Sequence, residues 1–95
     1  MAKRQKRIHR LFAMPPPKDF TWEELVTVMK SFRFDARCED GSHYEFVHET
    51  GFSVHISRPH PKNILKRYQI DAAKEAINQV TPDGNDPVQG LHGLH

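Results

Sequence analysis

Histidines are the residues of this chain best suited to chemistry, and seven of them occur in 95 residues. An imidazole that titrates near neutral pH can act as a general base or a general acid without a cofactor. His43 is the most informative, because it directly follows Gly41 and Ser42. The glycine lets a phosphate backbone approach closely, and the serine hydroxyl can hydrogen-bond to it. This combination is suited to general-base chemistry on a phosphodiester.

Two further histidines and a group of basic residues are predicted near His43. His55 falls on the neighbouring strand, and His60 falls in a loop stiffened by Pro59 and Pro61. Cleavage of RNA by its own 2'-hydroxyl requires a base, a cation that stabilises the developing charge, and contacts that position the backbone. The cationic candidates near the same edge are Arg58, Lys62, Lys66 and Arg67.

Each candidate has a non-catalytic alternative. On chemistry alone, the simpler interpretation of His43 is an exposed strand histidine, and that of His55 and His60 is a surface or structural role. Glu45 could pair with a histidine, although an exposed carboxylate without a role is the simpler expectation. A zinc site made by the three histidines is supported neither by a cysteine pair nor by a helical histidine pair, so no metal or cofactor is expected. The single cysteine, Cys38, is predicted to be a small buried side chain without chemistry.

The element that should cover one side of the site is a helix predicted over residues 22–32. Thr21 is placed to cap this helix, Glu24 holds the capping-box position, and Phe20 can pack onto Leu25 across the cap. Apolar residues recur at helical spacing and predict one buried face. That face consists of Trp22, Leu25, Val26, Met29 and Phe32.

Alternation of apolar and polar residues then predicts three antiparallel strands. They are expected over residues 34–39, 42–48 and 52–57, with a turn at Asp40 and Gly41 between the first two. A three-residue loop ending in Gly51 fixes the register of the second and third strands, with Tyr44 opposite Ile56 and Phe46 opposite Val54. This register collects the large apolar side chains of the hairpin, except Val47, on one face. The opposite face carries His43, Glu45, Ser53, His55 and Ser57.

A last helix is predicted over about residues 66–80, with a buried stripe of Ile70, Ala73, Ile77 and Val80. The predicted fold class is therefore α+β: a helix, a three-stranded antiparallel sheet and a second helix, with both helices on one face of the sheet. We expect this domain to span residues 20–81. Residues 82–95 have no periodicity and are expected to be a disordered tail.

Residues 1–19 form a basic N-terminal arm that ends in a proline linker. A short helical extension is predicted over residues 3–13, with Ile8, Leu11 and Phe12 on one side. Residues 1–18 contain six basic and no acidic residues, whereas the remainder has 8 basic against 12 acidic residues. If the protein binds a polyanion such as nucleic acid without sequence preference, this arm would supply most of the positive charge. The alternative is that the arm is only a solvated tail with no role in binding.

Composition excludes a membrane-spanning class. No apolar run approaches the roughly 20 residues that a bilayer span needs. The basic N-terminus lacks the apolar stretch of a signal peptide, because His9 and Arg10 interrupt Ile8, Leu11 and Phe12. A cytoplasmic protein without a membrane partner is expected.

Four stretches, in their order along the chain, resemble the HicA (YcfA-like) toxins of bacterial toxin–antitoxin pairs. They are FTWEELVTVMKSF (20–32), GSHYEFVH (41–48), Gly51 and RPHPKNILKRYQI (58–70), and the arm KRIHRLFAMPPP resembles an extension found in one branch. The resemblance implies a fold similar to double-stranded-RNA-binding domains and metal-independent cleavage of mRNA. It also implies a partner, a HicB-type antitoxin protein that covers the active site.

The resemblance places the family's catalytic histidine on His43, and it favours an active enzyme over an incidental histidine. It does not decide which group protonates the leaving oxygen, for which His55, His60 and Arg58 are candidates. Arg33 replaces the glycine that commonly follows the first helix of the family. The competing hypothesis is a non-catalytic module of the same fold that binds RNA or docks a partner. A DNA-binding accessory is disfavoured, because no helix outside the arm is markedly basic.

Overall fold

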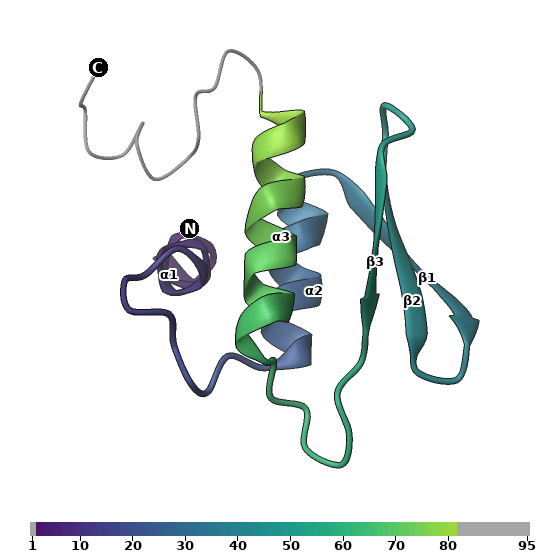
Figure 1. Cartoon of the computed structure of the whole chain (residues 1–95). Helices are drawn as coiled ribbons and strands as arrows, with labels where there is room; N and C mark the ends of the chain where they lie inside the picture. Colours follow the sequence, from purple (N-terminus) through teal and green to yellow (C-terminus); the bar gives the residue numbers. More distant parts are fainter. Residues whose placement is uncertain (1, 82–95) are drawn as a thin grey trace.

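The predicted order of a helix, a three-stranded antiparallel sheet and a second helix is confirmed in the computed structural model, which describes residues 2–81. The elements are α1 (Ala2–Leu11), α2 (Trp22–Ser31), β1 (Phe34–Asp40), β2 (His43–His48), β3 (Ser53–Ser57) and α3 (Arg67–Val80). Both α2 and α3 cover the same face of the sheet, and α1 lies on the far side of this helical layer (Figure 1). The tail predicted for residues 82–95 lies outside the described residues.

Helix α2 begins where its capping signals predict. The hydroxyl of Thr21 accepts a hydrogen bond from the backbone N–H of Glu24 at 3.1 Å, and the Glu24 carboxylate accepts one from the Thr21 N–H at 3.0 Å. The predicted buried face needs one correction: Val28 is fully buried, while Val26 and Phe32 are only partly buried. Because α2 packs against α1 as well as against the sheet, its buried face is rotated and widened relative to a helix covered on one side.

In the turn after α2, position 33 has a backbone conformation that favours glycine, but the residue there is arginine. Arg33 has a φ of 70°, in the left-handed region that a side chain disfavours. Its N–H donates to the carbonyl of Lys30 at 2.9 Å, which closes the end of the helix. The backbone therefore keeps a glycine-like turn with an arginine in it.

The predicted hairpin register is confirmed. Tyr44 lies opposite Ile56, and Phe46 lies opposite Val54. Gly51, with a φ of 99°, closes the three-residue loop through its N–H, which donates to the carbonyl of His48 at 2.8 Å. The apolar face of the hairpin meets the helices through Trp22 of α2, whose ring centroid lies 5.0 Å from that of Tyr44 and 5.5 Å from that of Phe46.

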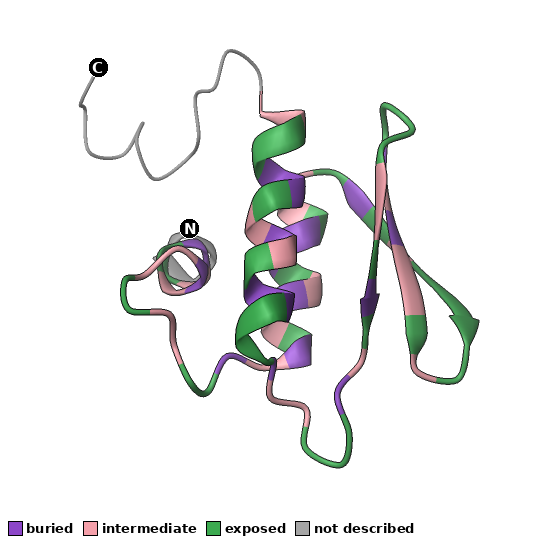
Figure 2. Ribbon diagram, viewed as in Figure 1, coloured by how far each residue is buried: buried purple, intermediate pink, exposed green. Residues whose placement is uncertain are grey.

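Two side chains expected on the covered face lie at its margins instead. Cys38 was expected to be buried but is exposed, and Phe52 is 37% exposed. The second half of β1 runs past the edge of the helical layer, so nothing covers Cys38 there (Figure 2). Phe52 stands next to the loop at the opposite end of the sheet. Alternation sets which face a residue occupies but not how far the covering helices reach.

Helix α1 belongs to the core rather than to a solvated tail. Ile8 and Leu11 are buried in the same cluster as the residues of α2 and α3. The guanidinium of Arg10 pairs with Glu24 at 3.5 Å and with Asp19 at 3.1 Å, which ties the helix to the start of α2. None of the helices within residues 2–81 is long and apolar enough to cross a membrane.

Candidate active site

His43 is exposed at the first position of β2, and strand alternation puts it on the face opposite to that of buried Phe46, which the helices leave open. Its Nδ1 lies 3.2 Å from the backbone carbonyl oxygen of Asp40. A carbonyl oxygen can only accept, so Nδ1 carries a hydrogen and donates a hydrogen bond to Asp40. In the neutral imidazole, this tautomer leaves Nε2 with a free lone pair. Nε2 is therefore the atom of His43 that can take a proton from a substrate.

The turn before His43 is shaped by Gly41, which has a φ of 57°. A Cβ at this position would meet no heavy atom within 4 Å, so the backbone is open to an approaching group. Ser42 is half-buried, and its carbonyl accepts a hydrogen bond from the N–H of Arg58 at 2.7 Å. The turn that carries the Gly-Ser-His sequence is thereby joined to the basic loop that follows β3.

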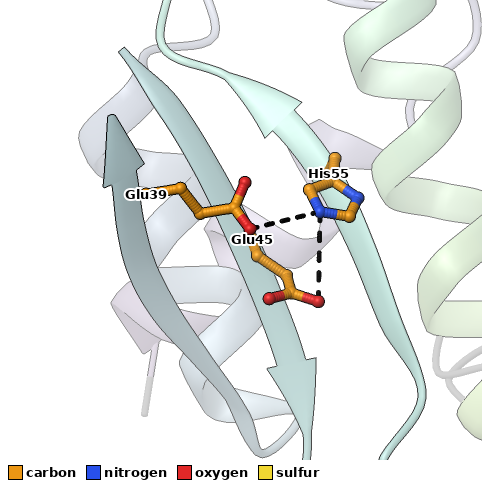
Figure 3. Close-up of side chains that lie close together, drawn as sticks. All are labelled: Glu39, Glu45 and His55. Carbon is orange, nitrogen blue, oxygen red and sulfur yellow. Dashed lines mark ion pairs between the residues drawn. The ribbon is translucent and has the colours of Figure 1, made fainter. Parts of the chain in front are cut away.

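His55 lies on the same open face, on β3, beside two carboxylates (Figure 3). Its Nε2 is 3.5 Å from a carboxylate oxygen of Glu39 and 4.0 Å from one of Glu45. Glu45 was expected to be more simply an exposed carboxylate without a role; instead it is directly opposite His55 in the sheet and approaches its ring. His43 is opposite Ser57, so His43 and His55 are diagonal neighbours across β2 and β3, within reach of side chains that act on one substrate.

Arg58 braces its own loop instead of pointing freely at a ligand. Its Nε donates to the side-chain carbonyl of Asn63 at 3.2 Å, and its Nη2 lies 3.6 Å from a carboxylate oxygen of Glu23. Asn63 in turn donates to Glu23 at 3.1 Å and accepts from the N–H of Trp22 at 2.7 Å. This network holds the loop against the start of α2. The sequence gives no local signal for it, because Glu23 and Asn63 are 40 residues apart.

The other basic candidates, Lys62, Lys66 and Arg67, are exposed, as is His60. Arg67 forms an exposed ion pair with Asp71 at 3.6 Å. They occupy the segment from the end of β3 to the first turn of α3, at the same end of the sheet as the β1–β2 turn (Figure 1). The hydrogen bond that links this segment to the turn that carries His43 is made by the backbone of Arg58, whereas Arg67 lines a hollow beside Pro15 and Pro17 of the linker.

Gln69 links this segment to the sheet, a role that sequence reasoning missed. It is buried at the start of α3, where its carbonyl oxygen accepts from the N–H of Lys66 at 3.0 Å. Its amide group donates to the carbonyl of Ser57 at 2.7 Å. A glutamine three residues after a helix start is the only sequence signal for this arrangement.

His48 is a buried structural residue on the covered face of the sheet. It is buried, its ring packs edge-on against Phe34, and its Nδ1 lies 2.9 Å from the hydroxyl of Thr50. The same Nδ1 accepts from the N–H of Thr50 at 3.2 Å, which stabilises the hairpin loop. His48 therefore takes no part in the candidate site.

Comparisons of the chain with protein-family models, with curated proteins and with solved structures give no match. The function is therefore inferred from the residues and their geometry, together with the resemblance stated above.

Proposed function

We propose that this protein is a metal-independent endoribonuclease that cleaves mRNA, acting as the toxin of a toxin–antitoxin pair. The observation that carries the proposal is the hydrogen bond from Nδ1 of His43 to the carbonyl of Asp40, because it leaves a basic Nε2 exposed beside an open turn. The order of helix, three strands and helix agrees with the fold that the HicA resemblance implies, which is similar to that of double-stranded-RNA-binding domains.

In the proposed reaction, Nε2 of His43 accepts the proton of a ribose 2'-hydroxyl. The 2'-oxygen then forms a bond to the adjacent phosphorus, and the bond from phosphorus to the 5'-oxygen of the next nucleotide breaks. The 5'-oxygen takes up a proton, so the products are a 2',3'-cyclic phosphate and a 5'-hydroxyl. Gly41 lets the phosphate approach the turn, and Ser42 contributes a hydroxyl that can position it.

His55 is the best-placed candidate for protonating the leaving oxygen. It shares the open face with His43 and lies diagonally across from it in the hairpin. Arg58 is less suitable, because its guanidinium is engaged by Asn63 and Glu23. His60 lies in the exposed loop beyond β3. Exposed Lys62, Lys66 and Arg67 supply positive charge along the path of the RNA backbone.

The open face of the sheet is also the surface that an antitoxin would have to cover. A HicB-type partner that lies across β2 and β3 would block access to both His43 and His55. In this proposal the protein acts in the cytoplasm, where mRNA is the substrate, and needs no cofactor.

The decisive experiment compares wild type, His43→Ala and the control His9→Ala, which alters an exposed histidine on α1. After induction in bacteria, we expect growth arrest and loss of bulk mRNA for wild type and His9→Ala only. Purified protein treated with EDTA should cleave RNA and leave 2',3'-cyclic phosphate ends. Equal behaviour of wild type and His43→Ala would refute the enzyme and leave a non-catalytic RNA-binding or partner-docking module.

A further inference from the structure

We propose that Glu39, Glu45 and His55 form a binding site for a zinc ion. The three side chains come from three adjacent strands, β1, β2 and β3, and they converge on the open face of the sheet (Figure 3). Their ligand atoms all lie within 4.8 Å of one another. This set differs from the three histidines weighed from the sequence, because it includes neither His43 nor His60.

The spacing of the ligand atoms is close to what zinc requires. Zinc bound by nitrogen and oxygen at about 2.0–2.1 Å in a tetrahedron holds its ligands about 3.4 Å apart. The separations from His55 Nε2 to the two carboxylates are 3.5 Å and 4.0 Å. The carboxylate oxygens of Glu39 and Glu45 lie within 4.8 Å of each other, so rotation of the side chains must bring all three ligand atoms closer to reach this spacing.

The backbone positions of the three residues are fixed independently of any metal. Glu45 is directly opposite His55 in the β2–β3 register, and that register is set by the loop at Gly51. Glu39 lies on the same face as Asp35 and Arg37 by the alternation of β1, at the point where the register shifts between Cys38 and Asp40. The site is thus carried by paired strands rather than by a loop.

The charges around the cluster favour a bound cation. Arg37 is directly opposite Glu45 in the sheet, but its guanidinium pairs with Asp35 at 3.4 Å instead. Among residues 6–81, whose side chains the structure describes, the only ion pairs formed by Glu39 and Glu45 are those with His55, which is charged only when protonated. Two neighbouring carboxylates without a lysine or arginine partner repel each other, and a divalent cation would neutralise both.

The ligand types select zinc over the common alkaline-earth ions. Mg²⁺ and Ca²⁺ prefer all-oxygen sites, whereas an imidazole nitrogen combined with carboxylates suits Zn²⁺. The side chains of His55, Glu39 and Glu45 are 65%, 44% and 27% exposed, so a fourth position remains open to water or another ligand. A three-ligand site with an open position is the arrangement that zinc adopts where it binds exchangeable groups.

The test measures Zn²⁺ binding by calorimetry to the full chain after removal of metal with EDTA and dialysis. We expect one equivalent to bind in wild type, and the affinity of that equivalent to fall at least about tenfold in His55→Ala and Glu45→Gln. His60→Ala, which removes an exposed histidine outside the cluster, is the matched control and should bind as wild type does. Excess Mg²⁺ should not compete.

Co²⁺ provides a second readout, since its visible absorption is intense only in tetrahedral sites. The wild-type spectrum should show this absorption and Glu39→Gln should lose it, while the far-UV circular dichroism of both stays the same. Absence of Zn²⁺ binding to wild type, or affinity unchanged in all cluster variants, would overturn the proposal. No RNA enters these measurements, so their outcome is independent of whether the protein is a nuclease.

Discussion

Gly41 shows how a single residue can control the chemistry of the candidate site. Its left-handed backbone orients the Asp40 carbonyl and the start of β2, and the bond between that carbonyl and His43 sets the tautomer. Gly41→Ala meets no steric obstacle but strains the backbone by about 1–2 kcal/mol. We expect RNA cleavage to fall by about tenfold to a hundredfold as the turn relaxes and His43 shifts.

The control for this prediction is Gly51→Ala. Gly51 also has a positive φ and open space around its Cα, but it lies at the opposite end of the hairpin. Both variants should lower the free energy of unfolding in urea, and only Gly41→Ala should reduce cleavage per folded molecule. Equal loss of cleavage in the two variants would show that strain acts through global stability rather than through the tautomer of His43.

His55 is part of both the proposed nuclease site and the proposed zinc site. A zinc ion held by Glu39, Glu45 and His55 would occupy Nε2 of His55, the side chain that we propose protonates the leaving oxygen. We therefore expect added Zn²⁺ to slow RNA cleavage by the EDTA-treated protein, and Glu39→Gln to remain active and resist this inhibition. Initial rates measured against Zn²⁺ concentration check both points; inhibition of Glu39→Gln equal to that of wild type would place the inhibitory ion elsewhere.

The residue types of the candidate site were more predictable from the sequence than the contacts between them. The hairpin register could be predicted because alternation and the loop at Gly51 both determine it, and it correctly placed His43 and His55 on one face. The contact between Glu39 and His55 could not be predicted, because it joins the two outer strands of the sheet and depends on the rotamers of both side chains. The bond from His43 to Asp40 likewise depends on backbone angles at the turn.

At the scale of the elements, the junction between α2 and β1 contains the clearest local conflict. Arg33 is the only residue other than glycine with a positive φ within residues 2–81. Arg33→Gly should raise the free energy of unfolding by about 1 kcal/mol, because it relieves the left-handed strain. Chemical denaturation with urea measures the change.

The matched variant for this prediction is Arg33→Ala. Both substitutions remove the exposed ion pair between Arg33 and Glu49, but alanine keeps the strain. The free energy of unfolding should therefore be higher for Arg33→Gly than for Arg33→Ala. Equal stabilities of the two variants would mean that the turn tolerates a side chain at no cost.

The elements themselves were largely predictable, because their signals are local. The capping box at Thr21 and Glu24 and the glycine at position 51 each specify an end or a turn within a few residues. The burial of Val28 and the exposure of Cys38 were not predictable, since they depend on where α1 packs and where the helical layer ends. Local patterns give the faces of elements, and tertiary packing decides how much of each face is covered.

At the scale of the whole molecule, the basic residues of α1 lie far from those of the segment between β3 and α3. Helix α1, which carries the basic arm, lies on the far side of the helical layer from the sheet, whereas Lys62 and Lys66 lie at the end of the sheet near the β1–β2 turn (Figure 1). The open face between them and β1 carries acidic residues, namely Asp35, Glu39 and Glu45. Beyond the scissile phosphate, which must lie between His43 and His55, the RNA backbone should therefore follow the loop after β3 rather than the rest of the open face or α1.

This path predicts which lysines set the salt dependence of RNA binding. With the inactive His43→Ala protein as background, Lys62→Gln and Lys66→Gln should each weaken binding to a fluorescent single-stranded RNA. Each should also reduce the slope of log K against log salt by about one unit, since one phosphate contact is lost. Lys6→Gln, which removes an exposed lysine on α1, should leave the slope unchanged. If Lys6→Gln lowers the slope as much as the loop variants do, the arm must also contact the RNA. The strand would then have to wrap around the helical layer to reach His43.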